Sequence, residues 1–559
     1  MENVKPEPGE VTAVLPRPRR RSLGFWPLAI LLLVLAAALR FDALDSGLPH
    51  LRTRPDEDPV IQRTAGPARG EFDIDWTIYP SAYIYLCWIW GELGLRVGQA
   101  VGQLPPGDYL TTLHEAPEHI FLIDRSLSAL AGTTAVLLAM LLARRAFGDA
   151  AGLAAGLLVA TCFLHARDSH AVKTDVLLSF WILVTLLALR PLACVATLRR
   201  GVVAGLAVGA TMATKYPGIL LLASVWAAGV MGSARRGWRR LVPTPVIAAG
   251  LVAGLFFLAT SPFMLFNRES LDTILRLAAI VFPQALGGLM PASEEGSRGA
   301  LTILPEAPGL RTLVYHARFS LWYGAGPAAT LLAPLAVGWA LWTAKPLARL
   351  AAITFLTWFT AASLSPHLYA RYLTPVMPVL LLLEAGLLAV ACRRFAGSRS
   401  GLALVLLTTL VAAQPLASTL AFNRLAARTD TRVLATRWMA ENLPQGARMV
   451  VLGTRTWNWG VPELPPNVVW VNAKPELDEI VRRRVGYVLM HEHELFSSTV
   501  QLERREALLP RLRLLAEFDP YKKGRSDAVF EGSDAYYIPF HGFGAMERPG
   551  PRIRVYALE

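Results

Sequence analysis

The chain has 559 residues, of which 53% are hydrophobic and only 17% are charged. Soluble globular proteins carry about 25% charged residues, and apolar runs of nearly membrane-spanning length recur here, so the composition excludes an ordinary soluble protein. The formal net charge of +13 comes from short Arg and Lys clusters between apolar runs. Positive-inside orientation produces this pattern, so we exclude nucleic-acid binding.

The first membrane helix follows a basic cluster, RPRRR at residues 17–21. Basic clusters stay in the cytoplasm, so residues 1–22 are predicted to form a cytoplasmic tail and helix 24–41 to lead outward. The next basic pair ends the apolar run 121–143, which therefore returns inward. Residues 42–120 then form one extracytoplasmic loop. Its aromatic segment 79–98 is predicted to lie along the membrane surface rather than cross it.

The later apolar runs alternate in direction by the same rule, with a long outer loop at 263–318. We predict about 11 membrane crossings in total. The remaining predicted helices are 151–165, 175–190, 201–214, 217–232, 244–262, 321–343, 348–363, 373–391 and 401–420.

The C-terminal region differs in composition and follows the last predicted membrane helix. We predict a membrane domain over 23–421 and a small extracytoplasmic α/β domain over 422–559, because helical and strand patterns alternate there. The strand candidates are the apolar run in ARMVVL, NVVWVNA, GYVLMHE and RIRVYAL. The segment STVQLERREALLPRLRLLAEF, which ends at residue 518, is predicted to be helical.

Three outer loops and one helix junction carry ionisable groups where a membrane surface is expected. RPDEDPV contains Asp56, Glu57 and Asp58, and HARDSHAVKTD contains His170, Lys173 and Asp175. SPHLYARY contains His367, Arg371 and Tyr372, and Lys215 stands in ATKYPG. Ionisable groups at such positions are functional-site hypotheses. All of them fall on the outer side by the orientation rule, which allows them to line one cavity.

The chemistry of these groups is complementary. A carboxylate can take a proton from an attacking hydroxyl, while Arg and Lys bind a departing phosphate. The alternatives remain open at this point. The acidic loop could equally be an ordinary solvated loop. Arg371 and Lys215 could extend toward lipid headgroups, and the histidines could be hydrogen-bonded loop residues. Gly205 and Gly209 indicate a small-residue helix-packing face rather than a phosphate loop.

The ordered motifs resemble the GT-C superfamily of polyprenyl-phosphate-dependent glycosyltransferases. They are most similar to the branch that holds bacterial family 39 enzymes, protein O-mannosyltransferases and aminoarabinose transferases. The motifs that carry the resemblance are RPDEDPV, YPSAYIYL, RSLSALAG, RRAFGDAAGLAAGLL, HARDSHAVKTDVLLSF, GLAVGATMATKYPG and ARYLTPVMP, together with WMAENLPQGARMVV and the terminal RPGPRIRVYAL.

The resemblance implies an inverting transfer of a sugar from a polyprenyl phosphate to an acceptor hydroxyl outside the cytoplasm. It maps the family's acidic groups onto Asp56 and Glu57, with Asp56 the base, and onto Asp175. It maps the donor-phosphate contacts onto Lys215, Arg371 and Tyr372. The further candidate substrate contacts are His170, Lys173, His367 and Tyr79.

The resemblance leaves the cofactor open, because some family members need a divalent cation and others do not. The aminoarabinose transferases carry a charged Glu-Lys pair where this chain has TIYP, so a Mg²⁺ or Mn²⁺ site of their kind is in doubt here. The expected partners are a polyprenyl-phosphate-linked sugar, the lipid bilayer and an acceptor that is a protein, a lipid or a glycan. The expected location is the inner or plasma membrane of a cell.

Two other functional classes compete with this one. A transporter or flippase would use the same carboxylates and Arg371 to gate an anionic or lipid substrate. Such proteins place charges near mid-membrane and have repeated halves, whereas this chain has charges at one face and no repeat. A scaffold would use its outer domain to bind partners, and changes in its acidic loop would then be silent.

Overall fold

The computed structural model describes residues 24–54, 56–74, 76, 78–265, 308–365, 368–452, 459–472, 477–493, 495, 508–525, 527–532 and 537–559. The predicted cytoplasmic tail, most of the predicted outer loop at 263–318 and the candidate residue His367 lie outside these residues.

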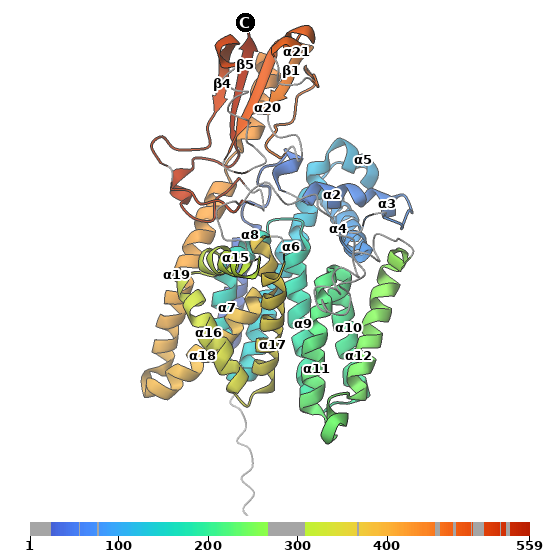
Figure 1. Cartoon of the computed structure of the whole chain (residues 1–559), viewed down its shortest axis with the longest axis vertical. Coiled ribbons are helices and arrows are strands. Elements are labelled where there is room, and N and C mark those ends of the chain that lie inside the picture. The colour runs from blue at the N-terminus through green and yellow to red at the C-terminus, as the bar shows by residue number, and fades with distance from the viewer. Residues whose placement is uncertain are drawn as a thin grey trace, which may run out of the picture.

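The described chain consists of a helical bundle, a layer of short helices on one end of it and a β-sheet beyond that layer (Figure 1). The bundle holds α1 (Phe25–Phe41), α6 (Pro117–Phe147), α7 (Asp149–Thr161), α9 (Thr174–Cys194), α10 (Leu198–Thr214), α11 (Leu221–Gly232), α12 (Thr244–Thr260), α16 (Pro327–Trp342), α17 (Pro346–Ser363), α18 (Met377–Phe395) and α19 (Ser400–Ala426). The end layer holds α2 (Glu57–Arg63), α3 (Ala65–Ala68), α4 (Ser81–Ala100), α5 (Tyr109–Glu115), α8 (Phe163–Asp168), α15 (Pro308–Tyr315) with a π-helical turn at His316–Tyr323, and the 3₁₀ turn Ala370–Val376.

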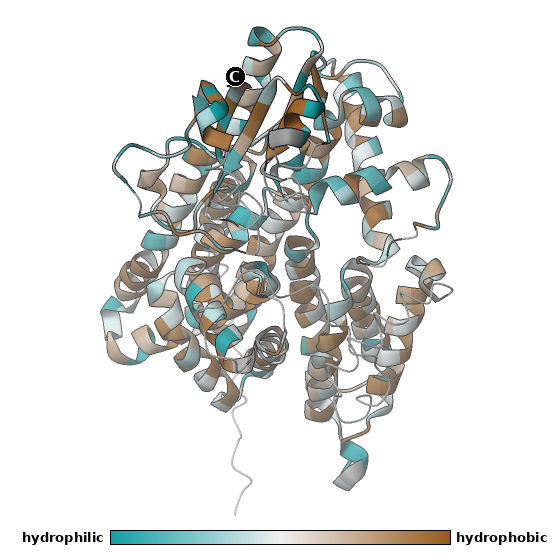
Figure 2. Cartoon of the chain, turned by 45° about the horizontal axis from the view of Figure 1, so that its top comes forward, coloured by the Kyte–Doolittle hydropathy of each residue, from teal (hydrophilic) through white to brown (hydrophobic). Residues whose placement is uncertain are grey.

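The helix boundaries agree with the apolar runs of the sequence to within a few residues. Four described helical segments are long and apolar enough to cross a membrane, or five if the bent pair Leu310–Tyr323 and Pro327–Trp342 is one span. Four shorter apolar helices stand beside them, so the chain is a multi-pass membrane protein. The figure of about 11 crossings stays a prediction. Hydrophobic residues colour the bundle helices in Figure 2, and hydrophilic ones gather in the loops and the sheet region.

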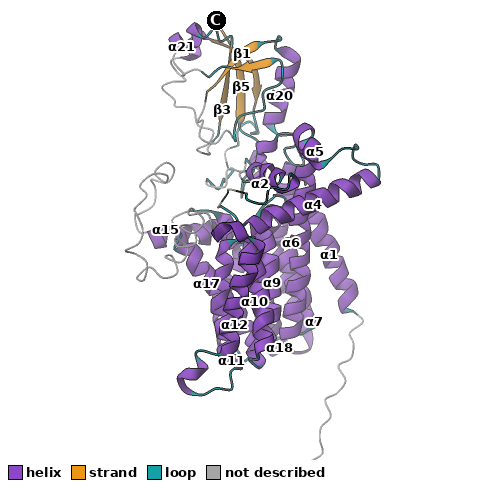
Figure 3. Cartoon of the chain, turned by 90° about the vertical axis from the view of Figure 1, so that its right-hand side faces the viewer, coloured by secondary structure: helices purple, strands orange, loops and turns teal. Residues whose placement is uncertain are grey.

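Helix α4 covers the aromatic segment predicted to lie along the membrane surface. It is not among the described helices that pass the length and hydropathy criteria for a span. Figure 3 shows it running obliquely at the end of the bundle that faces the sheet. This placement agrees with the expectation that residues 79–98 do not cross.

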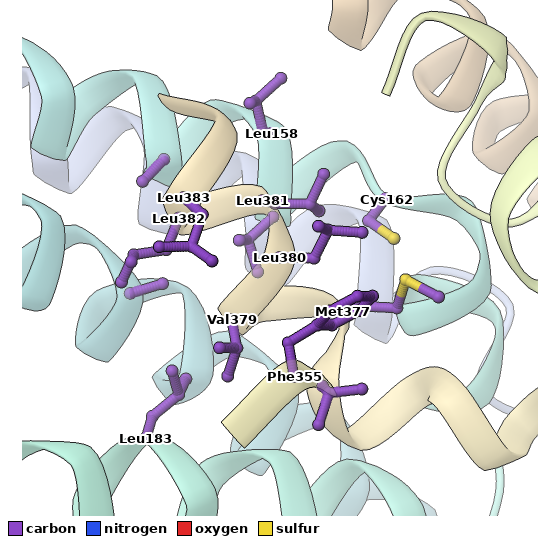
Figure 4. Close-up of a cluster of buried hydrophobic side chains, with 14 of the residues drawn as sticks. Leu158, Cys162, Leu183, Phe355, Met377, Val379, Leu380, Leu381, Leu382 and Leu383 are labelled. Carbon is purple, nitrogen blue, oxygen red and sulfur yellow. The ribbon is translucent and has the colours of Figure 1, made fainter. Parts of the chain in front are cut away.

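Helix α18 lies in the middle of the bundle core. Its residues Val379–Leu383 are almost fully buried, and Figure 4 shows them surrounded by side chains that include Leu158 of α7, Leu183 of α9 and Phe355 of α17. A helix that is apolar on every side is covered either by lipid or by other helices, and here other helices cover it. The 3₁₀ turn before α18, which carries Arg371, is therefore held at a fixed place.

Small residues allow α10 and α12 to approach closely, as the sequence predicted. A Cβ atom added at Gly205 would lie 2.5 Å from the Ala249 carbonyl oxygen, and one at Gly209 would lie 2.7 Å from Phe256 Cβ. Both positions therefore require glycine, since real Cβ contacts do not come this close. This packing fixes the end of α10, after which Lys215 follows.

The C-terminal region contains a five-stranded mixed sheet in the order β2-β1-β3-β5-β4. Its strands are β1 (Ala447–Leu452), β2 (Val468–Trp470), β3 (Tyr487–Glu492), β4 (Leu512–Phe518) and β5 (Arg552–Leu558). β1 pairs in parallel with β2 and β3, while β5 pairs antiparallel with β3 and β4. Helix α20 (Thr431–Asn442) covers one face and α21 (Leu477–Arg482) the other. The predicted domain boundary at 421/422 falls inside α19.

One prediction for this region was wrong. Residues 512–518 were expected to be helical, because Leu, Arg, Ala and Glu favour helices, but they form the edge strand β4. Pairing with β5 supplies hydrogen bonds and burial that override this modest local preference. A register shift between Leu514 and Ala516 interrupts the ladder.

The segment between β4 and β5 attaches the sheet region to the bundle. Phe540 is buried with its ring 5.6 Å from that of Phe163, and the Arg167 guanidinium lies 4.5 Å from the centre of the same Phe540 ring. His541 stacks on Tyr323. This segment therefore shares the hydrophobic core of the bundle, while the strands of the sheet have hydrophobic cores of their own.

The close packing of α10 on α12 generates the first prediction. Gly205→Val should lower the apparent melting temperature of the detergent-solubilised protein, because overpacking costs about 1–3 kcal/mol. Gly250→Val is the matched control, since a Cβ at Gly250 would meet nothing within 4 Å. Equal melting temperatures for Gly205→Val and the wild type would contradict this packing.

Candidate functional site

Four of the candidate residues form one continuous chain of ion pairs. A guanidinium nitrogen (Nη2) of Arg371 lies 3.1 Å from Asp56 Oδ2, and Arg371 Nε lies 3.9 Å from Asp175 Oδ2. Lys215 Nζ donates to the other oxygen of Asp175 at 2.7 Å. These residues come from four separate parts of the sequence. The structure therefore brings together two carboxylates and two cations at one end of the bundle.

Asp56 has an unusual backbone conformation. It precedes the first residue of α2 with φ 74° and ψ −20°, in the left-handed region that non-glycine residues rarely adopt. An aspartate at such a position normally caps its helix, but this side chain makes no capping hydrogen bond. The strained backbone instead directs the carboxylate to Arg371. Strain of this kind is typical of functional positions.

Asp56 and Asp175 differ in exposure. The Asp56 side chain is 30% exposed, whereas that of Asp175 is 2% exposed. Asp175 stands in the first turn of α9, and Lys215 follows directly after α10. Only Asp56 is therefore open to a substrate, while Asp175 holds the two cations in place.

Tyrosine side chains surround the two cations. Lys215 Nζ lies 5.8 Å from the centre of the Tyr79 ring and 5.9 Å from that of Tyr372, and the Arg371 guanidinium lies 4.2 Å from the centre of the Tyr369 ring. Burial and the neighbouring Asp56 carboxylate hold the pKa of Tyr79 well above its usual value. Its phenol is therefore neutral and can donate a hydrogen bond.

Glu57 lies next to Asp56 but points into the protein. It is fully buried, and its two oxygens accept hydrogen bonds from Arg125 Nε at 2.9 Å and Nη2 at 2.8 Å. The Val172 N–H donates to the same carboxylate at 2.9 Å. Both oxygens are thus engaged, so Glu57 positions the acidic loop and does not face the ion-pair chain.

Arg125 completes this anchor. Besides Glu57, it donates to the carbonyl oxygens of Leu44 and Ser46 and to Thr53 Oγ1. All five N–H groups of its guanidinium are therefore used. A buried ion pair is stable only when its remaining polar atoms are also hydrogen-bonded, as they are here.

The other candidates have different surroundings. The ring nitrogens of His170 contact the carbonyl oxygens of Ala166 at 2.8 Å and Asp42 at 2.9 Å, so this residue joins the loop to the end of α1. Lys173 is almost fully buried at the start of α9. The roles of both as substrate contacts stay predictions, as does that of His367.

The ion-pair chain does not fit a divalent cation in its present arrangement. Both carboxylates face Arg371, and Asp175 also binds Lys215, so a metal ion would have to displace protein cations. Within the described ranges, no three His, Cys, Asp or Glu side chains are placed to hold a metal.

The role of Arg125 as the partner of Glu57 was not predicted from the sequence. Asp124 and Arg125 interrupt an apolar run, FLIDRSLSAL, and ionisable residues in such a run are a usable signal. The pairing with Glu57 could not be read from the sequence, because 68 residues separate the two.

Residues 123–266 match the family described as dolichyl-phosphate-mannose-protein mannosyltransferase. The matched segment contains Asp175 and Lys215, while Asp56 and Arg371 lie outside it. The resemblance to polyprenyl-phosphate-dependent glycosyltransferases is thereby confirmed for about a quarter of the chain. No protein with a curated description matches the chain in sequence.

Several solved membrane enzymes are similar in structure. The ArnT structure from Cupriavidus metallidurans bound to undecaprenyl phosphate is 16% identical, with 95% of this chain and 98% of ArnT covered and a TM-score of 0.49. The Archaeoglobus fulgidus oligosaccharyltransferase is 14% identical, with 84% and 70% covered and the same TM-score of 0.49. The S. cerevisiae protein O-mannosyltransferase Pmt1-Pmt2 complex bound to the sugar donor is 16% identical, with 46% and 33% covered and a TM-score of 0.29. Because each of these TM-scores is below 0.5, no conclusion about the function of this chain is drawn from these similarities.

The anchor of the acidic loop generates a pH-dependent prediction. Burial alone would raise the pKa of Glu57, but Arg125 lowers it below its ordinary value of 4.5. The ionised pair therefore stabilises the fold above about pH 4.5 and loses its contribution as the pH falls through the lowered pKa. Glu57→Gln should cost about 3–5 kcal/mol at neutral pH, because it leaves Arg125 buried without a counter-charge.

Apparent melting temperatures of wild type and Glu57→Gln, measured between pH 7 and pH 3, check this. The difference between the two proteins should shrink on acidification. A difference that is the same at every pH would show that the ionised pair contributes nothing.

Proposed function

We propose that the chain is an inverting glycosyltransferase that moves a sugar from a polyprenyl-phosphate donor to an acceptor hydroxyl at the extracytoplasmic face of a membrane. The observation that carries the proposal is the ion-pair chain Asp56–Arg371–Asp175–Lys215 at one end of the bundle. The family match supports the donor class, because dolichyl-phosphate mannose is a polyprenyl-phosphate sugar.

The reaction needs two kinds of groups on opposite sides of the sugar. The acceptor oxygen forms a bond to the anomeric carbon while the bond from that carbon to the phosphate oxygen breaks. The hydroxyl proton passes to a carboxylate, and the electron pair of the broken bond leaves with the polyprenyl phosphate. A base is therefore needed near the hydroxyl, and cations are needed near the leaving phosphate.

Asp56 is assigned as the base because it is the more exposed of the two carboxylates in the ion-pair chain. Arg371 and Lys215 are assigned to the donor phosphate, with Arg371 as a planar donor and Lys215 as a point charge. Asp175 positions both cations. Tyr79 and Tyr372 lie beside Lys215, where their hydroxyls are candidates for contacts to the phosphate or the sugar.

The ion pairs of Arg371 with both Asp56 and Asp175 are consistent with a base at Asp56 and a phosphate-binding cation at Arg371. In the ligand-free arrangement its charge is shared by Asp56 and Asp175. A donor phosphate would compete with Asp56 for the guanidinium and leave that carboxylate for the acceptor hydroxyl. Donor binding would thus prepare the base before the acceptor reacts.

The transporter alternative is less well supported. Asp175 stands in the first turn of α9, Lys215 follows the end of α10, and Arg371 lies in the 3₁₀ turn before α18, so none of them is near the middle of a helix. Transporters usually bind substrate near mid-membrane. Placement of this end of the bundle outside the cytoplasm, with residues 1–22 inside, belongs to the proposal.

Replacement of the base generates the first functional prediction. Asp56→Asn should lower the rate of sugar transfer from a polyprenyl-phosphate sugar by about 100-fold or more, because the amide cannot accept the hydroxyl proton. The measurement is product formation by purified protein at saturating donor. Glu71→Gln is the control, since Glu71 is an exposed carboxylate in the same loop that pairs only at the surface with Arg69. Transfer by Asp56→Asn at the wild-type rate would refute the assignment.

A second functional prediction concerns Lys215, the cation assigned to bind the donor phosphate. Lys215→Met should weaken binding of undecaprenyl phosphate about 10- to 100-fold, the loss expected for one charged hydrogen bond. Binding is measured by titration in detergent at fixed ionic strength. Arg96→Gln, at an exposed cation on α4, should bind as the wild type does. Unchanged affinity for Lys215→Met would mean that this cation serves Asp175 alone.

A further inference from the structure

A cavity of about 760 Å³ lies between the first loop and the C-terminal sheet. One wall comes from residues 50–62 and includes His50, Arg52 and Asp58. The other comes from the sheet region and includes Glu463, Trp470 and His491. The volume falls within the range of roughly 300–1,000 Å³ that is usual for sites that enclose small ligands. Neither the ion-pair chain nor the bundle core uses these side chains.

The two walls are held together by specific contacts. The Leu51 N–H donates to Glu463 Oε1 at 2.9 Å. Arg432, which is almost fully buried and paired with Asp430, donates to the carbonyl oxygens of Arg52 at 3.2 Å and Trp459 at 2.6 Å. A buried arginine therefore joins the first loop to the sheet region. The cavity is a built feature of the fold and not a loose gap.

Two buried histidines face this cavity with unused ring nitrogens. His491 is 0% exposed, and neither of its ring nitrogens has a hydrogen-bond partner among the described residues. His50 is 3% exposed, and its Nδ1 lies 3.5 Å from Glu463 Oε1, which is long for a hydrogen bond. Buried polar atoms without partners are costly, so a small side-chain shift that lets these ring nitrogens bond to an occupant of the cavity would be favourable.

The histidines are neutral at physiological pH. Burial and the nearby charge of Arg432 lower the pKa of His50 to about 3 and that of His491 to about 4. Each neutral ring has one N–H donor and one nitrogen acceptor. Hydroxyl groups also both donate and accept, so they match this surface better than groups that only accept or only donate.

The charges of the lining disfavour an anionic occupant. The lining contains one arginine, Arg52, and two carboxylates, Asp58 and Glu463, with Gln62 beside Asp58. A phosphorylated lipid headgroup would meet more negative than positive charge here. Trp470, which is 53% exposed on the edge strand β2, adds a flat apolar surface. A sugar ring combines such an apolar face with a rim of hydroxyls.

The cavity also lies next to the assigned base. Asp58 lines the cavity, and Asp56, two residues earlier, contacts Arg371. Two residues span at most about 7 Å of chain. The backbone of Asp56 therefore lies within about 7 Å of the cavity wall, close enough for a hydroxyl group of an occupant to be near this carboxylate.

From these observations we propose that the cavity is the acceptor site and that the acceptor is an uncharged glycan, an inference that rests on the proposed glycosyltransferase function. The bound glycan would stack one ring on Trp470 and hydrogen-bond to His50, His491 and the carboxylates. The enzyme would then extend or decorate an existing saccharide.

The test measures binding without any donor. The full-length protein in detergent is applied to immobilised neutral oligosaccharides, namely glucans, mannans, galactans and chitooligosaccharides, beside immobilised Ser/Thr-rich peptides. We expect binding to at least one oligosaccharide, weakened about tenfold or more by Trp470→Ala. Val469→Ala is the matched control, since Val469 is the neighbouring exposed residue of β2 and does not line the cavity. Gln62→Ala, on the opposite wall, should also weaken binding, and unchanged melting temperatures show that each variant is folded.

The outcomes separate this inference from the function on which it rests. Binding to peptides alone, no binding to either panel, or glycan binding that Trp470→Ala and Gln62→Ala leave unchanged would each overturn the glycan acceptor site. None of these results affects the Asp56→Asn comparison, which measures transfer itself. In transfer assays with a bound glycan, Trp470→Ala should raise KM for the acceptor about tenfold and leave kcat near the wild-type value.

Discussion

The buried ion pair between Glu57 and Arg125 determines where the rest of the site can lie. It fastens the acidic loop to α6 at a point where water is excluded, and Arg125 gathers three further groups of the same loop. With Glu57 turned inward, Asp56 can face outward only through its left-handed backbone conformation. The positions of Asp56, the proposed base, and of the cavity wall at Asp58 thus follow from one pair of charges. Three adjacent acidic residues therefore have different surroundings: Glu57 anchors the loop, Asp56 contacts Arg371, and Asp58 lines the cavity.

None of the four residues of the ion-pair chain indicates a site by itself, but their contacts with one another do. A lone cation at the end of a membrane helix usually reaches toward lipid headgroups. Arg371 and Lys215 instead share Asp175, and the rigid core around α18 and the close α10–α12 contact hold their backbones in place. In the proposed function, such preorganised cations would bind the donor phosphate with little rearrangement of the protein. The bundle therefore acts as a frame for a few side chains at its end.

Much of this arrangement is readable from the sequence, and the rest depends on contacts between distant residues. The helices follow from apolar runs, and the orientation rule places Asp56, Asp175, Lys215 and Arg371 on one side, where the structure joins them. Strand β4 was missed because its composition favours a helix and only pairing with β5 makes it a strand. The roles of Arg125, His491 and Trp470 were equally hidden, because each depends on a partner or a wall contributed by another segment.

The order of strands in the sheet has a consequence for how the protein is made. β5 lies between β3 and β4, so β4 has no place in the sheet until β5, synthesised about 35 residues later, has been added. His491 on β3 is also flanked by Ile553 of β5. The sheet behind the cavity wall is therefore complete at His491 only once the last strand, β5, has paired with β3. A chain that ended before residue 552 would keep the ion-pair chain of the bundle but would leave the edge of β3 next to His491 unpaired.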